Sequence, residues 1–437
     1  MFEIVCLTFI FALMAYLIRR GVDVSYALVA GTVVLALFFG IQWGRFPRGL
    51  ASELQGIAAN SVKAAVDPGN LELLGLVLLI QFLGHALKHT RSLERLIAAL
   101  KALLADRRAA MAVAPAFIGL LPMPGGALFS APMVGELTHD LEVPREDRTL
   151  INYWFRHVWE WTWPLYPGIL FAATIAKAPL GRVILAQAPL TLAAIAIGIL
   201  ACFRRVRLPA GDRGRTTVGT WRELLAATWP VLLVIALTAA LGAADYLKAP
   251  IAVPGTTALL IALAIANPLF LILKRVPWRE AAGLVRQTLS IRLIVLVYGV
   301  VAFGHMLRAY GAARDLPATF AEWGVPPLVL MFSVPLLVGL LTGYMPAVVG
   351  ICFPVLLPLM IEGAGGHATI HYGRLAFAYA GGLFGVLLSP VHLCLVLSRE
   401  YFEADFALVY RRLAPLIAVM AAAALGTLAL WEAVGLR

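Results

Sequence analysis

The stretch Leu120-Leu121-Pro122-Met123-Pro124-Gly125-Gly126 interrupts a long apolar run, and Leu340-Leu341-Thr342-Gly343-Tyr344-Met345-Pro346 interrupts another about 220 residues later. The two runs cover residues 109–138 and 327–361. Each arm, taken as a helix, reaches only ~20 Å, against the ~30 Å of a bilayer's hydrocarbon core. Paired Gly/Pro-interrupted half-helices predict two re-entrant hairpins, the arrangement that transporters build around a binding site. The alternative for each run is one Pro-kinked crossing.

The composition indicates an integral membrane protein. Of the 437 residues, 61% are hydrophobic and 14% are charged, where soluble domains average ~25% charged residues. Long apolar blocks predict helices, because alternating residues would be needed for a barrel. The net charge of +11 lies between the apolar blocks, which is typical of positive-inside topology and not of nucleic-acid binding. We expect a multi-pass protein in the lipid bilayer of a prokaryotic inner membrane.

The order of the apolar runs predicts two repeats, residues 1–203 and 224–437, joined by a basic linker at 204–223. Pro124 and Pro132 are eight residues apart, as are Pro346 and Pro354. Each repeat contains scaffold spans, a hairpin, a broken span and a closing span: 2–87, 109–138, 150–175 and 183–203 in the first, and 224–307, 327–361, 375–398 and 413–432 in the second. The fold class expected is therefore all-α, with two inverted repeats of about five crossings and one Gly/Pro-tipped hairpin each.

The distribution of Lys and Arg tests this topology. With re-entrant hairpins each half crosses five times, and the 35 Lys and Arg divide as 24 on one face and 10 on the other, with Arg156 inside a span. If each interrupted run crosses once, the division is 16 against 18. The model with re-entrant hairpins gives the excess of Lys and Arg on one face that the positive-inside rule predicts. It places the N-terminus outside and the linker in the cytoplasm.

The first tip is a candidate anion site. Helices that begin at a tip point free N–H groups and a positive dipole end toward the midplane. Glycines allow a ligand to approach the backbone closely, although close helix packing explains them almost equally well. The candidate binding residues here are Met123, Pro124, Gly125, Gly126 and Ser130.

The first broken span contains ionisable side chains in apolar surroundings, which usually face a bundle interior and have a function. We expect Arg156 to bind the anion beside Asn152, and His157 and Glu160 to be candidates for proton coupling. Arg156 and Glu160 are four apart, so a continuous helix would place them on one face. Pro164 and Pro167 are expected to break that helix. The alternative is a salt bridge at the interface within an aromatic belt.

The second half contributes the other side of the predicted site. Its tip supplies Thr342, Gly343, Met345 and Pro346, and its broken span, rich in glycine, supplies Ser389 and His392. The four cysteines, Cys6, Cys202, Cys352 and Cys394, are far apart in apolar sequence, which indicates small buried side chains. We therefore expect no metal and no cofactor, and the absence of a P-loop argues against ATP as the direct energy source.

Several motifs resemble one family. They are Leu121-Pro122-Met123-Pro124-Gly125-Gly126-Ala127, Asn152-Tyr153-Trp154-Phe155-Arg156-His157, Trp163-Pro164-Leu165-Tyr166-Pro167 and Ser389-Pro390-Val391-His392-Leu393-Cys394-Leu395. They are similar to an uncharacterised prokaryotic integral membrane family, domain of unknown function 401, which resembles the ion transporter superfamily of citrate, gluconate and arsenite permeases. The resemblance implies inverted repeats, a scaffold and a transport domain, elevator-like motion and often a homodimer. The Ser-Asn-Thr tips of sodium–dicarboxylate carriers are missing.

The expected function is secondary transport of a small anion, an organic acid in particular, coupled to a proton or a sodium ion. Two alternatives remain open: an intramembrane enzyme acting on a lipid-linked substrate, with His157 and Glu160 as acid and base, and a membrane subunit of a larger complex. The mirrored halves favour transport, because an enzyme does not need a second copy of its site.

Overall fold

The first half of the chain forms a series of helices. The computed structural model describes residues 2–41, 50–103, 106–121, 125–208, 221–246, 253–312, 319–320, 322–362 and 369–435. The helices of the first half are α1 (Phe2–Arg19), α2 (Val24–Gly40), α3 (Leu50–Val66), α4 (Pro68–His89), α5 (Ser92–Leu103), α6 (Arg107–Gly119), α7 (Ala127–Leu137), α8 (Arg145–His157), α9 (Pro167–Ala176) and α10 (Leu180–Cys202).

The second half has closely similar elements in the same order. A 3₁₀ turn, η2 (Phe203–Arg205), follows α10. The second-half elements are α11 (Trp221–Tyr246), α12 (Gly255–Leu273), α13 (Trp278–Thr288), α14 (Ile291–Ala309), α16 (Pro327–Thr342), α17 (Met345–Met360), the antiparallel strands β1 (Ile361–Glu362) and β2 (Thr369–Ile370), α18 (Tyr372–Leu388), α19 (Leu393–Phe402) and α20 (Phe406–Val434).

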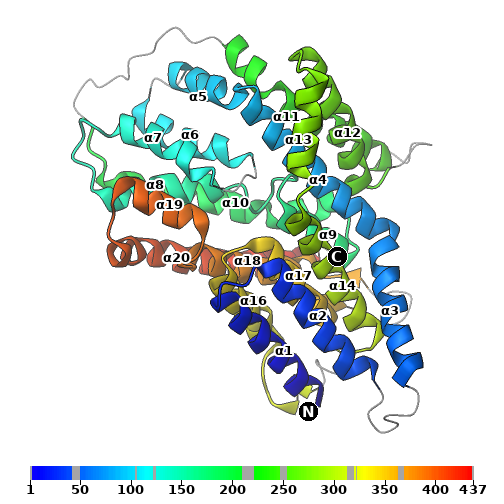
Figure 1. Cartoon of the computed structure of the whole chain (residues 1–437). Coiled ribbons are helices and arrows are strands. Elements are labelled where there is room, and N and C mark those ends of the chain that lie inside the picture. The colour runs from blue at the N-terminus through cyan, green and yellow to red at the C-terminus, as the bar shows by residue number, and fades with distance from the viewer. Residues whose placement is uncertain are drawn as a thin grey trace.

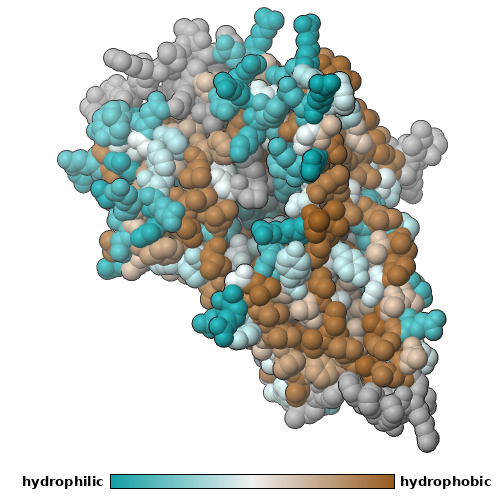
Figure 2. All heavy atoms as spheres, in the orientation of Figure 1, coloured by the Kyte–Doolittle hydropathy of each residue, from teal (hydrophilic) through white to brown (hydrophobic). Residues whose placement is uncertain are grey.

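The helices are those of an all-α membrane protein. Within the described ranges, seven helical segments are long and apolar enough to cross a bilayer. Large apolar side chains also point outward, as Leu200 (74% exposed) and Ile272 (70%) do. Figure 2 shows such side chains spread over the part of the surface formed by α1, α2 and α14, with hydrophilic residues gathered toward the top and left of the view. A surface of this kind is stable in lipid and not in water.

The two halves pack into one another instead of standing apart. Helix α2 of the first half packs against α14 of the second, and α4 of the first half packs against α12 of the second. Farther along the chain, α7 packs against α19 and α17 packs against α9. Figure 1 shows the elements of both halves interleaved around the middle of the molecule. Each of these four pairings therefore has a counterpart in which the roles of the two halves are exchanged.

Each interrupted run forms a pair of antiparallel helices. In the first, Nε of Arg107, at the start of α6, donates to the carbonyl of Leu137, at the end of α7, at 2.8 Å. In the second, α16 and α17 pack together and are joined by Gly343 and Tyr344 alone. Helix α16 runs parallel to α18, and the N–H of His371 at the start of α18 donates to the Met360 carbonyl at the end of α17, 2.8 Å away. Helix α17 therefore ends where α16 begins.

Both predicted broken spans are broken, although the first breaks earlier than expected. Helix α8 ends at His157, before Pro164, because residues 158–166 form successive turns closed by short-range bonds such as Glu160 N–H to the His157 carbonyl (3.2 Å). The expectation that Pro164 breaks the helix was wrong. Pro167 instead begins α9, the position where a missing N–H costs nothing. In the second half α18 ends at Leu388 and α19 begins at Leu393, around Ser389-Pro390.

Candidate ligand site at the two helix breaks

A cavity of about 190 Å³ lies where the two helix breaks meet the two helix pairs. Both halves of the chain line it. The lining residues are Gln81, Gly125, Arg156, His157, Glu160, Tyr166, Pro167, Gly168, Gly343, Tyr344, Met345, Pro346, Tyr379, Val386, His392, Leu393 and Cys394.

Four helix N-termini face this cavity. Helix α9 starts at Pro167, α17 at Met345 and α19 at Leu393, and all three residues line it. Gly125, two residues before α7, lines it as well. The N-terminus of a helix has free N–H groups and about half a positive charge. The cavity is therefore surrounded by donors and by positive potential.

Arg156 adds a full positive charge to the cavity. It lies in the last turn of α8 and is 3% exposed. Its guanidinium lies against the backbone of Gly126, where a Cβ would overlap it unless the guanidinium moved. Its Nε donates to Sγ of Cys394 at 3.4 Å. The charge is thus held in place between α7 and α19.

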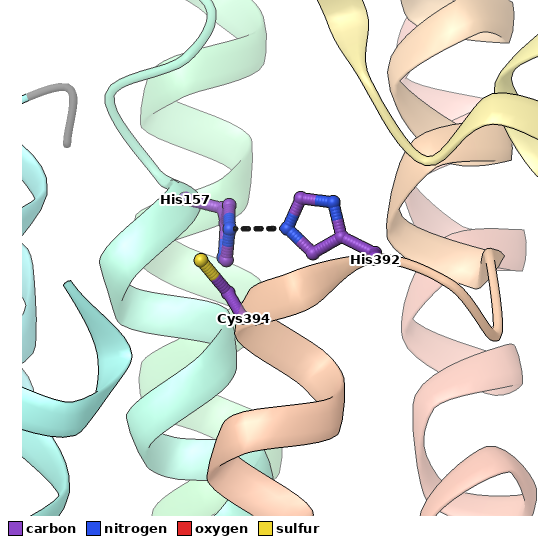
Figure 3. Close-up of side chains that lie close together, drawn as sticks. All are labelled: His157, His392 and Cys394. Atoms are coloured by element: carbon purple, nitrogen blue, oxygen red, sulfur yellow. Dashed lines mark hydrogen bonds between the residues drawn. The ribbon is translucent and has the colours of Figure 1, made fainter. Parts of the chain in front are cut away.

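Two histidines and a cysteine meet beside Arg156 (Figure 3). Nε2 of His157 lies 3.1 Å from Nε2 of His392. The thiol of Cys394 points toward the two imidazoles. One ring nitrogen of each histidine and Sγ of Cys394, the atoms that could bind a metal, lie within 4.8 Å of one another. These three residues could hold a metal ion. His157 comes from the end of α8 and the other two from the start of α19, so the cluster joins the two halves.

Glu160 lies in the break and not on α8. The expectation of a shared helix face with Arg156 was therefore wrong, because the helix ends at His157. Its carboxylate oxygen Oε1 is 3.8 Å from Nε2 of His157, and its main-chain carbonyl accepts from the Tyr379 hydroxyl at 3.0 Å. The carboxylate faces the cavity beside the histidine pair.

Each helix break also holds the end of its own half's helix pair. In the first half, the Trp163 indole donates to the Leu120 carbonyl at 2.8 Å and the Tyr166 hydroxyl donates to the Gly119 carbonyl at 2.6 Å. In the second, the Ser389 hydroxyl donates to the Leu340 carbonyl at 2.7 Å. His392 Nδ1 donates to the Gly343 carbonyl at 2.8 Å. These bonds satisfy carbonyls that a helix end leaves without partners.

The site residues expected from the sequence fall into three groups. Eight line the cavity: Gly125, Arg156, His157, Glu160, Gly343, Met345, Pro346 and His392. Five lie next to it and hold its walls: Gly126, Ser130, Asn152, Thr342 and Ser389. Asn152, for example, bonds the Ala127 carbonyl of α7 (3.3 Å) and the Ser398 hydroxyl of α19 (2.8 Å). Met123 and Pro124 lie outside the described residues.

The sequence analysis missed Cys394 and the tyrosines of the cavity. Tyr166 and Tyr379 place hydroxyls in the site, and Cys394 stands two residues after His392 at the start of α19. A His-x-Cys pair directly after a Ser-Pro break was the available signal. Its apolar neighbours made the cysteine resemble a core residue.

The fold and the site define an all-α membrane protein with two broken helices and a polar cavity at the breaks. The chain belongs to the family described as protein of unknown function (DUF401), whose family model matches residues 7–432. A search of the curated proteins finds no match.

Proposed function

We propose that this protein is a secondary active transporter, a permease, that carries a small anion such as an organic carboxylate across the prokaryotic inner membrane. The single observation that supports it most is the convergence of four helix N-termini and one buried arginine on the same cavity. Helix N-termini are general anion-binding sites, and Arg pairs with carboxylates through two parallel hydrogen bonds.

The charges of the cavity favour an anionic guest. A charge within a membrane costs from ~2.5 to over 10 kcal/mol, so Arg156 needs compensation. Glu160 in the same cavity offsets one positive charge, and the four N-termini contribute about half a charge each. The remaining positive potential attracts a small anion, which Gly125 and Gly343 allow close to the backbone.

The packing supports two inverted repeats with re-entrant hairpins. The pairings α2–α14 and α4–α12, and α7–α19 and α9–α17, exchange the roles of the two halves, as expected for elements related by a pseudo-two-fold axis. The pairs α6–α7 and α16–α17 are 11–16 residues per helix, too short to cross hydrocarbon in one helix. The 24-to-10 division of Lys and Arg agrees with tips that enter from opposite faces, the N-terminus outside and the linker inside.

Alternating access in this arrangement would move the cavity with both helix pairs. The coupling cation, a proton or another cation, would bind at His157 and Glu160 next to the anion. We include in the proposal that the protein resembles the citrate, gluconate and arsenite permeases in its repeats and hairpins.

The test is anion binding and uptake by the purified full-length protein. A thermal-shift screen in detergent against organic acids and inorganic oxyanions identifies a stabilising anion, and proteoliposomes then measure its uptake. Arg156→Gln, which keeps a polar side chain with N–H donors and removes the charge, should abolish both the anion-induced stabilisation and the uptake. Arg156→Lys should keep part of the binding, because it keeps the charge and loses the two-point geometry.

Arg182→Gln is the matched control, since Arg182 is exposed and lies outside the cavity. It should bind and transport as the wild type does. Uptake at the wild-type rate by Arg156→Gln would remove Arg156 from the site. A wild-type protein that no anion stabilises and that moves none would overturn the proposed function.

A further inference from the structure

We propose that His157, His392 and Cys394 bind a divalent transition-metal ion of the Zn²⁺ type, with Glu160 as the fourth ligand. The proposal starts from the hydrogen bonds of the two imidazoles. Nδ1 of His157 lies 2.6 Å from the Tyr153 carbonyl, and Nδ1 of His392 lies 2.8 Å from the Gly343 carbonyl. A carbonyl only accepts, so both Nδ1 atoms must carry a proton.

The tautomers leave two lone pairs facing each other. With Nδ1 protonated, the Nε2 atom of each neutral imidazole has a bare lone pair. These two atoms are only 3.1 Å apart. Two lone pairs at this distance repel unless a positive species lies between or beside them. A cation at this place would remove that repulsion.

The surroundings match those of a metal ligand set. Histidines that bind metals almost always donate their other ring N–H to a carbonyl or a carboxylate, which fixes the tautomer. Two nitrogens bound to a tetrahedral Zn²⁺ at ~2.0–2.1 Å lie about 3.3–3.4 Å apart. The observed 3.1 Å differs from this by a few tenths of an ångström. Only a small movement of the imidazoles would be needed.

The thiol and the carboxylate complete the set. Sγ of Cys394 belongs to the same group of donor atoms, all within 4.8 Å. The Arg156 guanidinium donates to this sulfur at 3.4 Å and so stabilises the thiolate form that binds metals. Oε1 of Glu160 is 3.8 Å from Nε2 of His157 and stands outside the group of three, so this side chain would move closer to bind the same ion. Two nitrogens, one sulfur and one oxygen are ligands that Zn²⁺ accepts.

A single proton shared between the imidazoles is the competing explanation of the 3.1 Å contact. It needs two nitrogens and nothing more. It gives no reason for a thiol and a carboxylate to face the same place, whereas a metal ion uses all four groups. The observations therefore favour the metal.

The ion would also set the charge of the cavity. Without it, the side-chain charges of Arg156 and Glu160 balance, and only the helix N-termini attract an anion. Binding of a divalent cation releases the Cys394 thiol proton to solvent, so the ion and the thiolate together add one positive charge. The cavity is then left with the charge that a monoanion neutralises. The metal as the coupling cation rests on the proposed function, whereas the metal site rests on its own geometry.

The test is metal binding by the full-length protein, purified in detergent with a tag that contains no histidine and stripped with a chelator. Titration with Co²⁺ should give a sulfur-to-cobalt charge-transfer band in the near ultraviolet and intense visible bands of a tetrahedral ion, saturating at an equimolar ratio. Zn²⁺ should remove both. Cys394→Ser should lose the charge-transfer band. His392→Ala and Glu160→Gln should each weaken Co²⁺ binding at least about tenfold.

Cys352→Ala is the matched control, because Cys352 is a buried cysteine of α17 outside the cavity. It should titrate as the wild type does. Absence of the sulfur-to-cobalt band in the wild type overturns the proposal, whether or not any variant folds. A band that survives in Cys394→Ser and is lost in Cys352→Ala overturns it too. No organic acid is added in this experiment, and metal loading does not depend on transport, so a loaded metal site without transport would overturn only the proposed function.

Discussion

The two helix breaks of this protein have the same architecture and different chemistry. Both interrupt a helix beside the same cavity, and both donate hydrogen bonds to the end of the helix pair in their own half. The first break uses aromatic side chains and carries Arg156 and Glu160 near it. The second uses Ser389 and His392 and follows a helix with glycines at Gly381, Gly382 and Gly385. The scaffold is shared, whereas the charges are concentrated in one half.

Close helix packing and the placing of charged side chains are therefore achieved mainly in different halves of the chain. The second half achieves close packing: side chains at Gly381 and Gly385 of α18 would overlap the main chain of α16. The first half uses a single glycine of α6, Gly119, against the Arg156 carbonyl. The most extensive close contact between helices, that of α16 with α18, therefore lies in the half without Arg156 and Glu160, although Gly119 makes one equally close contact beside Arg156. The predictions below test this division, from the largest effect to the smallest.

The largest effect is expected at the α16–α18 contact. Gly385→Ala would place a methyl group on the Leu336 carbonyl oxygen, and neither rigid helix can move aside without disturbing the cavity. We expect a loss of about 3 kcal/mol or more of unfolding free energy, or no folded protein. Size-exclusion profiles and thermal unfolding in detergent measure it.

Gly426→Ala in α20 is the control, since a side chain there meets nothing within 4 Å. It should leave the unfolding temperature equal or slightly raised, because alanine favours a helix more than glycine does. Equal unfolding temperatures for the two variants would mean that α16 and α18 are not in main-chain contact.

The next effect compares the hydrogen bonds at the two breaks. Ser389→Ala leaves the Leu340 carbonyl without this donor at a place where Ser389 is 0% exposed, and should cost about 1–3 kcal/mol. Tyr166→Phe removes the bond to Gly119, but Tyr166 lines the cavity and water can replace its hydroxyl. We expect about 0.5–1.5 kcal/mol there. Thermal unfolding of both variants in one detergent gives the comparison.

Ser61→Ala is the control for the loss of a hydroxyl. Its Oγ bonds the Ile57 carbonyl of its own helix, which accepts a main-chain bond as well, so the change should stay within about 0.5 kcal/mol. A larger loss for Tyr166→Phe than for Ser389→Ala would show that water reaches the bond at the second break and not the bond at the first.

The smallest effect is a pH dependence at the start of α18. The Nδ1 of His371 accepts the Arg374 N–H at 3.2 Å, whereas Pro144, the residue before α8, provides no side-chain cap. Burial, and then the charge of Arg374, hold the pKa of His371 below its usual value, against the opposing carboxylates of Glu362 and Glu432. The unfolded chain then binds more protons, so this stability is present above about pH 6.5 and is lost as the pH falls toward the lowered pKa.

His371→Asn keeps a capping acceptor and removes the titration. We expect the difference in unfolding temperature between about pH 8 and about pH 5 to shrink in this variant, by an amount that reflects a few tenths to about 1 kcal/mol. An unchanged difference would show that the cap does not titrate.

The sequence predicts the helical elements well, because its signals are local. Proline and glycine interrupt helices wherever they stand in an apolar run, so both helix pairs and both breaks could be located from the residues alone. The start of the first break could not, since the turns after His157 depend on Trp and Thr side chains that bond other helices. Ser130, Asn152 and Thr342 were predicted to bind the anion, and the structure places them in the walls.

The cluster of His157, His392 and Cys394 is the part of the site that could not be predicted from the sequence. His157 and Cys394 are brought together by the packing of α8 on α19. A local sequence pattern does not predict which residues of the two halves come into contact. Cys394 has the apolar neighbours of a core cysteine, which is why no metal was expected. Its place in the cavity, beside Arg156 and the two Nε2 atoms, distinguishes it from Cys6, Cys202 and Cys352.

The position of Cys394 gives the wild-type chain a chemical reporter of its own. All four cysteines are buried, and Cys394 is the one that lines the cavity. A mercurial or maleimide reagent in the surrounding water would therefore react at this position when the cavity becomes accessible. Mass spectrometry would then time that exposure in native membranes, without any introduced label.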